Sequence, residues 1–279
     1  GSLVRYEDGF DNTLVYTRGF DGEALKLEET SAKTATVKTT TFVKKRDSFG
    51  RLVSTDETVK ETNDQTFDDP AAFARDWKTD DTGHSIADGK LTVEAKNGNW
   101  IASIFDAIPA SQELSGSFTF SGSAADVITG AILIFLRFAS EGFNLGLRIL
   151  KDKVEIVERA NGTERPLGDA VSLTSPLIAG VAYLFSASIS ETADSKQKIS
   201  LSLGGTEILN VEIPAAQLFS QAGALAFGVK GAKVLFDDLT AVRSFVKGRG
   251  FGSSEVVSQR TDERGVTSYF NREGDIVRV

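Results

Sequence analysis

The feature that most constrains this sequence is a segment that occurs twice, once near each end of the chain. FVKKRDSFGRLVS occupies residues 42–54, and FVKGRGFGSSEVVS occupies residues 245–258. With a small offset around the glycines, the two segments share Phe, Val, Lys, Arg, a Phe-Gly pair and a closing Val-Ser. A second pair, residues 5–27 and 260–279, is similar at comparable spacing. Such self-similarity indicates a protein of repeated β-hairpins, opened at one loop to admit a separate domain.

The first part of the chain has the periodicity of antiparallel hairpins. LVYTRGF, EALKLEE and TATVKTTTFVKK alternate polar and apolar residues at period 2, and Asp-Gly, Asp-Asn and Phe-Gly turns separate them. The polar stretch at residues 55–65, TDETVKETNDQ, is rich in turn-forming residues and is predicted to be a linker.

The middle of the chain predicts a sandwich of short strands. It opens with TFDDPAAFARDW, in which Trp77 is expected in the core and residues 70–75 form a short helix capped by Asp69. Many short strand candidates follow, separated by glycine-containing turns, and a second short helix is expected at residues 214–221. The predicted fold is therefore all-β: a jelly-roll β-sandwich at residues 65–243, inserted into an antiparallel hairpin-repeat sheet formed by residues 1–64 and 244–279.

Charge and composition disfavour several classes of partner. The net charge is −8, and residues 65–243 hold 15 basic and 22 acidic side chains, a balance of −7. Nucleic acids and anionic membranes both require a basic face, so neither is expected as a partner. No uncharged apolar run approaches the length of a membrane-spanning helix, so no membrane insertion is expected. The chain has no cysteine, which excludes disulfides and thiolate chemistry.

The flanking segments resemble RHS/YD repeats, the hairpin repeats of bacterial surface and toxin-encapsulating proteins. The resemblance is carried by Arg46-Asp47, residues 50–53 and Thr55-Asp56 near the start, and near the end by Thr261-Asp262, Gly265, Thr267, Tyr269, Gly274 and Val277. It implies an extracellular or bacterial cell-surface location. It also implies that other repeats of the same parent protein are partners.

The middle resembles concanavalin-like or laminin-G-like jelly rolls of the kind used as carbohydrate-binding modules. The segments that carry the resemblance are TFDDPAAFARDW, DGKLTV, FNLGLRILKDKVEIVERANG and AKVLFDDLTAV. The resemblance implies a glycan or cell-surface polysaccharide as ligand. It also implies a structural calcium ion, held by Asp237 of the last strand with Asp68 and Asp69 of the opening segment, because calcium takes several carboxylate and carbonyl oxygens. The alternative is that these aspartates face water at turns and strand edges.

A candidate ligand contact lies around the second of the two tryptophans. Trp100 follows Asn97-Gly98-Asn99, which is predicted to be a loop, and an exposed ring there could stack on a sugar. The sequence therefore predicts a ligand site of Trp100, Asn97 and Asn99. The alternative is that Trp100 is a core residue.

No catalytic constellation is expected. Asp152, Glu155 and Glu158 form the nearest acidic series, but a spacing of three does not keep side chains on one face of a strand. They are predicted to be surface charges of a hairpin. The sequence therefore favours a non-catalytic extracellular binding or adhesion module displayed on a repeat-protein shell or stalk. The alternative is a structural spacer or protein-interaction domain of an RHS-type toxin-encapsulating protein.

Overall fold

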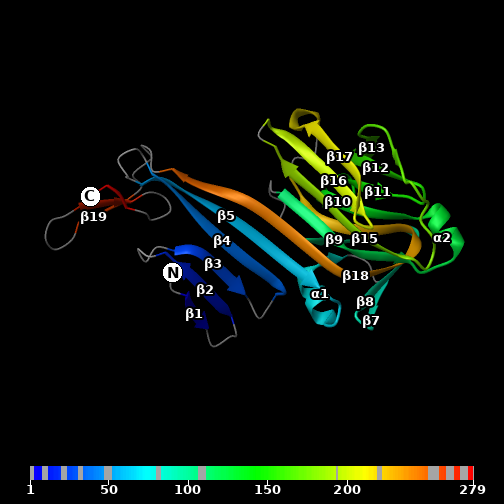
Figure 1. Cartoon of the computed structure of the whole chain (residues 1–279), viewed down its shortest axis with the longest axis horizontal. Coiled ribbons are helices and arrows are strands. Elements are labelled where there is room, and N and C mark those ends of the chain that lie inside the picture. Colours follow the sequence, from blue (N-terminus) through cyan, green and yellow to red (C-terminus); the bar gives the residue numbers. More distant parts are fainter. Residues whose placement is uncertain are drawn as a thin grey trace.

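The chain folds almost entirely into antiparallel β-strands (Figure 1). This computed structural model describes residues 3–7, 12–19, 24–30, 34–46, 52–79, 83–105, 111–192, 194–218, 222–250, 258–261, 267–270 and 276–278. The predicted all-β class is confirmed, and the layers of the central region are those of a β-sandwich. Within the described ranges, no helix has the length and apolarity needed to cross a membrane.

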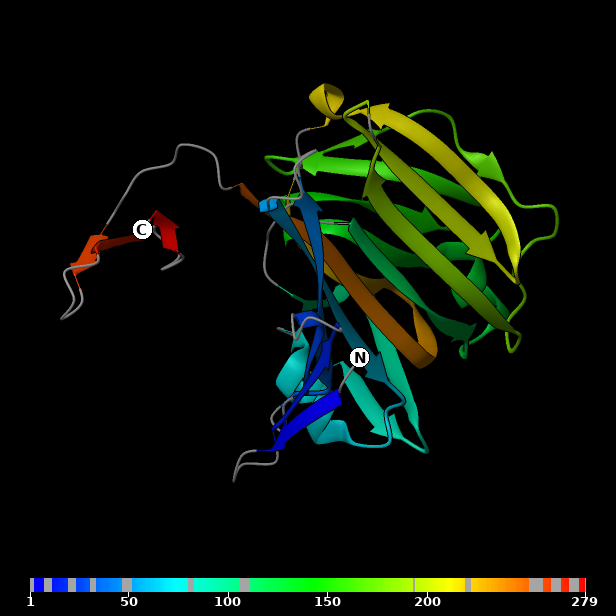
Figure 2. The ribbon, with the colours of Figure 1, turned by 60° about the vertical axis from the view of Figure 1, so that its left-hand side comes forward.

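The N-terminal strands form a meander in which each strand pairs with the next. Its members are β1 (Leu3–Glu7), β2 (Thr13–Arg18), β3 (Ala24–Thr30), β4 (Thr36–Arg46) and β5 (Leu52–Gln65). Three further short strands form a separate antiparallel sheet: β19 (Ser258–Thr261), β20 (Thr267–Phe270) and β21 (Ile276–Arg278). Figure 2 shows the meander as a single layer beside the two-layered sandwich.

The sandwich consists of two sheets packed face to face. The first, called here the groove sheet, contains β6 (Lys78–Thr79), β7 (His84–Ala87), β8 (Lys90–Ile104), β10 (Ala131–Ser140), β11 (Phe143–Ile149), β12 (Lys153–Ala160), β13 (Thr163–Pro166) and β14 (Val171–Ser172). The second, called the serine sheet, contains β9 (Ser111–Phe120), β15 (Ala182–Glu191), β16 (Lys196–Leu203) and β17 (Thr206–Pro214).

One long strand, β18 (Ala224–Gly250), belongs to the groove sheet, the serine sheet and the meander (orange in Figures 1 and 2). Up to Lys230 it lies between β8 and β10. After Gly231, at φ +63°, β9 replaces β10 as its neighbour, and after Asp238, at φ +50°, β5 has replaced β8. Because left-handed backbone turns a strand sharply, these two positions let β18 leave one sheet and enter the next.

The core lies between the two sandwich sheets and is rich in aromatic rings. Trp77 and Phe236 are almost fully buried there, and the ring of Phe227 lies 5.1 Å from that of Trp77 and 4.8 Å from that of Phe236. The predicted core position of Trp77 is thus confirmed. Strand alternation explains the pattern, since every second residue of each strand points inward.

In the described part of the chain, two short helices and one 3₁₀ turn connect the strands. The first helix, α1 (Pro70–Asp76), begins as predicted: Asp69 Oδ1 accepts a hydrogen bond of 2.9 Å from the backbone N–H of Ala71. The second, α2 (Ala124–Thr129), has a capping box between Ser123 and Asp126. Where a helix at residues 214–221 was predicted, a 3₁₀ turn, η1 (Ala215–Gln217), is present, and residues 219–221 lie outside the described residues.

The predicted linker at residues 55–65 is wrong, because this segment is most of strand β5. Its polar residues are paired on both sides, by β4 and by β18. At its end Asn63 is fully buried and donates hydrogen bonds to Asp76 Oδ2 at 2.7 Å and to Thr36 at 3.0 Å, while it accepts one from the indole N–H of Trp77. Buried polar side chains are stable when they are bonded in this way, which a polar sequence pattern does not reveal.

The described beginnings of the two repeated segments, residues 42–46 and 245–250, lie on either side of β5. Phe42 of β4 pairs with Glu57 of β5, and Phe245 of β18 pairs with Val59 of β5. Strand β18 continues through the predicted boundary at residues 243 and 244. The predicted division into residues 1–64 and 244–279 around residues 65–243 stays a prediction, as does the RHS/YD resemblance, several of whose residues lie outside the described ranges.

Candidate functional site

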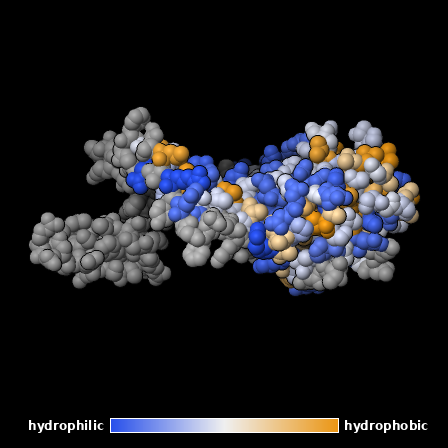
Figure 3. Space-filling view, turned by 90° about the horizontal axis from the view of Figure 1, so that it is seen from below, coloured by the Kyte–Doolittle hydropathy of each residue, from blue (hydrophilic) through white to orange (hydrophobic). Residues whose placement is uncertain are grey.

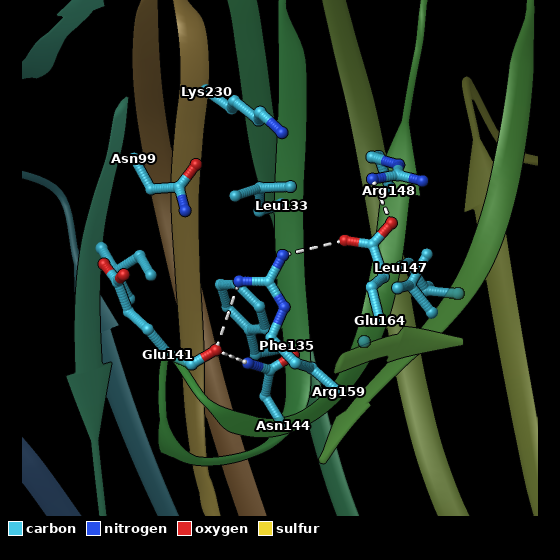
Figure 4. A pocket seen from close by; sticks show the side chains of 13 residues that line it. Asn99, Leu133, Phe135, Glu141, Asn144, Leu147, Arg148, Arg159, Glu164 and Lys230 are labelled. Carbon is cyan, nitrogen blue, oxygen red and sulfur yellow. Dashed lines mark hydrogen bonds and ion pairs between the residues drawn. The ribbon is translucent and has the colours of Figure 1, made fainter. Parts of the chain in front are cut away.

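A hollow on the outer face of the groove sheet is the candidate functional site, called here the groove (Figure 4). It is open to solvent, with an empty volume of about 480 Å³. Its lining comes from strands β8, β10, β11, β12, β13 and β18 and from the turn between β10 and β11. The lining residues are Asn99, Ile101, Leu133, Phe135, Glu141, Asn144, Gly146, Leu147, Arg148, Val157, Arg159, Glu164 and Lys230.

Strand alternation builds the floor of the groove. On β10, Ile132, Ile134 and Leu136 point into the core and are fully buried. The intervening Leu133 and Phe135 point outward into the groove, yet are only 8% and 9% exposed. They pack with Ala226 of β18 and with the partly buried Ile101 of β8, which makes the floor apolar.

Gly146 of β11 adds no side chain to the floor and lets β11 lie close to β10. A Cβ atom at this position would lie 2.4 Å from the carbonyl oxygen of Ile134 and 3.0 Å from Cα of Phe135. Any side chain would therefore push the two central strands apart. The position requires glycine because of close backbone approach, not because of an unusual φ angle.

One wall of the groove is a network of ion pairs. Arg148 donates from Nε to Glu155 at 2.8 Å and from Nη1 to Glu164 at 2.8 Å, and Arg159 donates from Nη2 to Glu164 at 3.0 Å. Burial disfavours the charged form of each of these partly buried carboxylates, but Lys153 and Arg148 outweigh this at Glu155, and Arg148 and Arg159 do so at Glu164. The pKa of each carboxyl is therefore lowered below its ordinary value of 4.5.

The same balance operates at Arg148. Partial burial opposes its charge, but hydrogen bonds and charges of Glu155 and Glu164 prevail, so its pKa is raised. The wall thus stays ionised across the neutral pH range. Its planar guanidinium groups are fixed in position, as recognition of a polar ligand requires.

The lower end of the groove is closed by a hydrogen-bonded turn. Asn144 donates from Nδ2 to the carbonyl oxygens of Ser140 at 3.1 Å and Glu141 at 3.0 Å. Arg159 Nη1 also donates to the carbonyl of Glu141, at 3.4 Å. Figure 4 shows the side chains of Asn144 and Arg159 both directed toward the carbonyl oxygen of Glu141. The contacts hold the turn between β10 and β11 against the floor.

The opposite end carries two polar groups whose hydrogen-bonding capacity is not used within the described part of the chain. Asn99 of β8 and Lys230 of β18 are register partners on adjacent strands. Asn99 Oδ1 is buried and has no hydrogen-bond partner among the described residues. Lys230 is exposed, and its ammonium group forms no ion pair with any described carboxylate. Figure 4 shows both side chains on the side away from the Glu141 turn.

The predicted ligand site around Trp100 needs correction. Residues 97–99 are not a loop but part of strand β8. Because neighbouring side chains on a strand alternate, Asn99 points into the groove and Trp100 points into the core, where it is fully buried against Phe227 and His84. Its ring is therefore not available to stack on a ligand. The side chain of Asn97 lies outside the described residues.

The three aspartates predicted to hold calcium have other contacts in this structure. Asp237 Oδ2 accepts a hydrogen bond of 2.8 Å from Lys90, and Asp69 caps helix α1. Asp68 lies near Gly89, since a Cβ atom on that glycine would be 3.1 Å from Asp68 Oδ1. Among the described residues, no group of three or more His, Cys, Asp or Glu side chains is arranged to hold a metal. The calcium site therefore stays a prediction.

The acidic series was predicted to consist of surface charges of a hairpin. This holds for Asp152, which is exposed just before β12, but not for the other two residues. Glu155 belongs to the groove wall, but Glu158 is fully buried on the opposite face of the strand and pairs with Arg165. Period-2 alternation separates these two residues, as expected for a spacing of three. The burial of Glu158 follows from its arginine partner, which cannot be read from the strand itself.

Most of the groove, including Arg148, Arg159 and Lys230, was not predicted from the sequence. A usable signal was present in β11, FNLGLRI, where Asn144, Gly146 and Arg148 alternate with buried aliphatic residues. The alternation marks one solvent-facing side of a strand that bears an amide, a glycine and a guanidinium. Only the pairing of six strands brings this side together with Asn99 and Lys230.

Comparisons with known proteins identify similar sandwiches but no family. No protein-family model matches the sequence, and no curated protein matches it. Similar solved structures are the carbohydrate-binding module CBM66 from Bacillus subtilis (12% identity, 59% of this chain, 94% of that chain, TM-score 0.46), the alginate lyase Aly36B (13%, 64%, 96%, 0.47) and the metal-free carbohydrate recognition domain of Emp46p (11%, 65%, 94%, 0.44). At these identities and TM-scores they assign no ligand or activity to this chain.

Proposed function

We propose that this protein is a non-catalytic glycan-binding module and that the groove is its binding surface. The observation that carries the proposal is an apolar floor bordered by fixed guanidinium and amide groups, with Asn99 Oδ1 and the Lys230 ammonium still free of partners among the described residues. Sugars present hydroxyl groups around an apolar ring surface. A shallow groove with convergent polar groups over an apolar floor matches that chemistry.

The groove carboxylates support binding over hydrolysis. Glycoside hydrolysis needs a carboxylic acid whose pKa is raised so that it can donate a proton. Glu164 instead accepts from both Arg148 and Arg159, and its pKa is lowered. This favours a structural role for Glu164 in the wall.

The proposed function is tested with immobilised polysaccharides and a glycan panel that contains neutral and acidic members. We expect the intact chain to be retained by at least one glycan, and a change that fills the groove, Val157→Trp, to abolish retention. Ser200→Trp on the serine sheet is the matched control, because Ser200 is part-buried on a sheet that carries no groove residue. If no glycan retains the intact chain, the proposal fails.

The second candidate is a structural spacer or protein-interaction domain on an RHS-type toxin-encapsulating protein. It is favoured by the joint between sandwich and meander, where β18 continues from one into the other and Asp76 accepts hydrogen bonds from Asn63 and from the backbone N–H of Ala35. Such a joint suits a rigid support. Absence of binding across the glycan panel, with a folded protein, would favour this candidate.

Display on a repeat-protein shell or stalk, at an extracellular or bacterial cell-surface location, is part of the same proposal. It is supported by the beginnings of the repeated segments, residues 42–46 and 245–250, which pair with strand β5 on its two sides. Other repeats of the parent protein would extend this sheet. Surface labelling of cells that produce the whole parent protein tests the location, and labelling that requires cell lysis would contradict it.

A structural calcium ion at Asp68, Asp69 and Asp237 remains a separate proposal. To bind calcium, Asp237 would have to give up its hydrogen bond with Lys90 and coordinate the metal instead. Thermal unfolding in calcium and in chelator provides the test: a higher midpoint in calcium is expected, and Asp237→Asn should remove the difference. Equal midpoints for the unaltered chain would reject calcium without affecting the groove.

A further inference from the structure

The charge of the groove has the opposite sign to that of the whole molecule. Among the described residues that line it, three are cationic, Arg148, Arg159 and Lys230, and two are anionic, Glu141 and Glu164, a balance of +1. Glu155, which pairs with Arg148 behind this lining, is balanced by its second partner, Lys153. The chain as a whole carries −8. A cationic hollow on an acidic protein is where an anionic group of a ligand would be most stable.

The positive charge is unevenly distributed within the groove. Arg148 and Arg159 already hold Glu164 between them, and Arg148 also holds Glu155. Lys230 has no such carboxylate among the described residues, and Figure 4 shows it at the end away from the Glu141 turn. Lys230 is therefore the available partner for an anion, while the arginines serve as the fixed wall.

Asn99 adds a hydrogen-bonding group beside this cation. It is the register partner of Lys230 across β8 and β18, and its Oδ1 is buried with no partner in the described part of the chain. An unpaired buried acceptor is stabilised when a ligand donates to it. A ligand that carries an anionic group and a neighbouring hydroxyl satisfies Lys230 and Asn99 together.

The floor of the groove favours an anionic ligand over a neutral one. Among the described residues that line the groove, Phe135 is the one aromatic residue, and it is 9% exposed. Its ring therefore offers little surface for stacking on a neutral sugar. Because charge-assisted hydrogen bonds are stronger than neutral ones, an anionic ligand gains more from this lining than a neutral ligand of the same shape.

Resting on the proposed glycan-binding function, we infer that the groove selects acidic glycans, with Lys230 as the partner of a carboxylate or sulfate group and Asn99 as the acceptor for an adjacent hydroxyl. The two anion types share the chemistry that Lys230 recognises. They differ in geometry and charge density, so matched ligands can distinguish them.

The experiment compares acidic polymers with neutral counterparts of the same backbone. Polygalacturonate and its fully methyl-esterified form make the carboxylate pair, and dextran sulfate and dextran make the sulfate pair. We expect at least one acidic polymer to bind about tenfold more tightly than its neutral partner at low salt, with the difference shrinking at high salt as ions screen the exposed charge.

Lys230→Gln is the decisive variant, and Lys233→Gln is its matched control. Lys233 lies on the same strand, loses the same charge, and pairs with Glu94 outside the groove lining. We expect Lys230→Gln to lose most of the preference for the acidic polymer and Lys233→Gln to keep it. Equal effects of the two changes would overturn the inference, since general polyanion attraction would then explain the binding.

The outcomes separate this inference from the proposed function. Retention of neutral and acidic polymers with equal affinity would overturn the acidic preference and leave glycan binding in place. Binding to neutral glycans alone would do the same. Failure of a folded protein to bind any polymer or any member of the glycan panel would overturn both.

Discussion

The outer faces of the two sandwich sheets follow the same strand alternation but differ in what they present to solvent. On the groove sheet, long side chains such as Arg148 and Lys230 surround a floor of Leu133 and Gly146. On the serine sheet, the register brings Ser115, Ser186 and Ser202 into one row, and Ser188, Ser200 and Glu113 into the next. Several of these hydroxyls are bonded within the sheet: those of Ser188 and Ser200 lie 2.8 Å apart, and Ser186 donates to Glu113 at 3.0 Å.

We infer from this contrast that a binding surface on a sheet requires side chains of different length. Short hydroxyls that bond to one another or to a neighbouring carboxylate leave few groups for a ligand. Long charged residues beside glycine and small apolar residues produce a hollow with polar edges. The alternation of inward and outward residues sets only which side is available. The identity of the outward residues decides whether that side can bind.

The largest expected change in stability is at Trp100, which lies in the core on the side of β8 opposite the groove. Trp100→Ala should lower the free energy of unfolding by about 3–5 kcal/mol, because it removes a fully buried ring from the core that both sheets share. Trp100→Phe should cost less. Urea unfolding followed by circular dichroism measures both. A variant with unchanged stability that lost only ligand binding would contradict the core position of Trp100.

A smaller effect is expected at the floor of the groove. Gly146→Ala should destabilise the fold by about 1–3 kcal/mol, since the new methyl group would overlap the backbone of β10. Ser200→Ala provides the comparison on the serine sheet. If the two alanine variants unfold at the same urea concentration, the two central strands of the groove sheet are not as closely apposed as described.

The contribution of the ion-pair wall to the free energy of unfolding should depend on pH. Because the pKa values of Glu155 and Glu164 are lowered on folding, the stability they provide is present above their ordinary value of 4.5 and is lost as pH falls through the folded-state pKa. Glu164→Gln should therefore cost about 0.5–1 kcal/mol at neutral pH, with the gap closing in acid. A gap that widened as the pH fell would contradict this assignment.

The smallest effect is expected on the serine sheet. Ser188→Ala removes one hydroxyl of the pair with Ser200, in a part-buried position where the remaining hydroxyl can turn to water. The free energy of unfolding should change by less than about 0.5 kcal/mol, and glycan retention should be unchanged. A loss of retention would mean that the serine sheet, and not the groove, contacts the ligand.

Much of the fold could be predicted from the sequence, because strand alternation and turn residues are local signals. The strands of the sandwich, helix α1 with its Asp69 cap, and the core position of Trp77 are of this kind. Strand β5 could not be recognised, because its stability comes from neighbours on both sides and from the buried contacts of Asn63.

The site was predictable only in small part. Asn99 was identified, but for the wrong reason: its neighbour Trp100 points to the other side of the same strand. Lys230 and Arg148 are 82 residues apart in sequence number, as 230 minus 148, and each looks like an ordinary surface charge. Their relation depends on which strands pair, and that is fixed by tertiary packing.

The passage of β18 from sandwich to meander has a consequence for excised versions of this protein. A fragment of residues 65–243 would keep Gln65 opposite Leu239 but lose residues 61–64 of β5, which are the partners of β18 residues 240–243. It would thus present an unprotected strand edge to solvent, open to pairing with a second molecule. It would also leave the carboxylate of Asp76 without the amide of Asn63. Self-association of such a fragment would be caused by the strand edge that the cut exposes. Fragments that retain β4 and β5 should not self-associate.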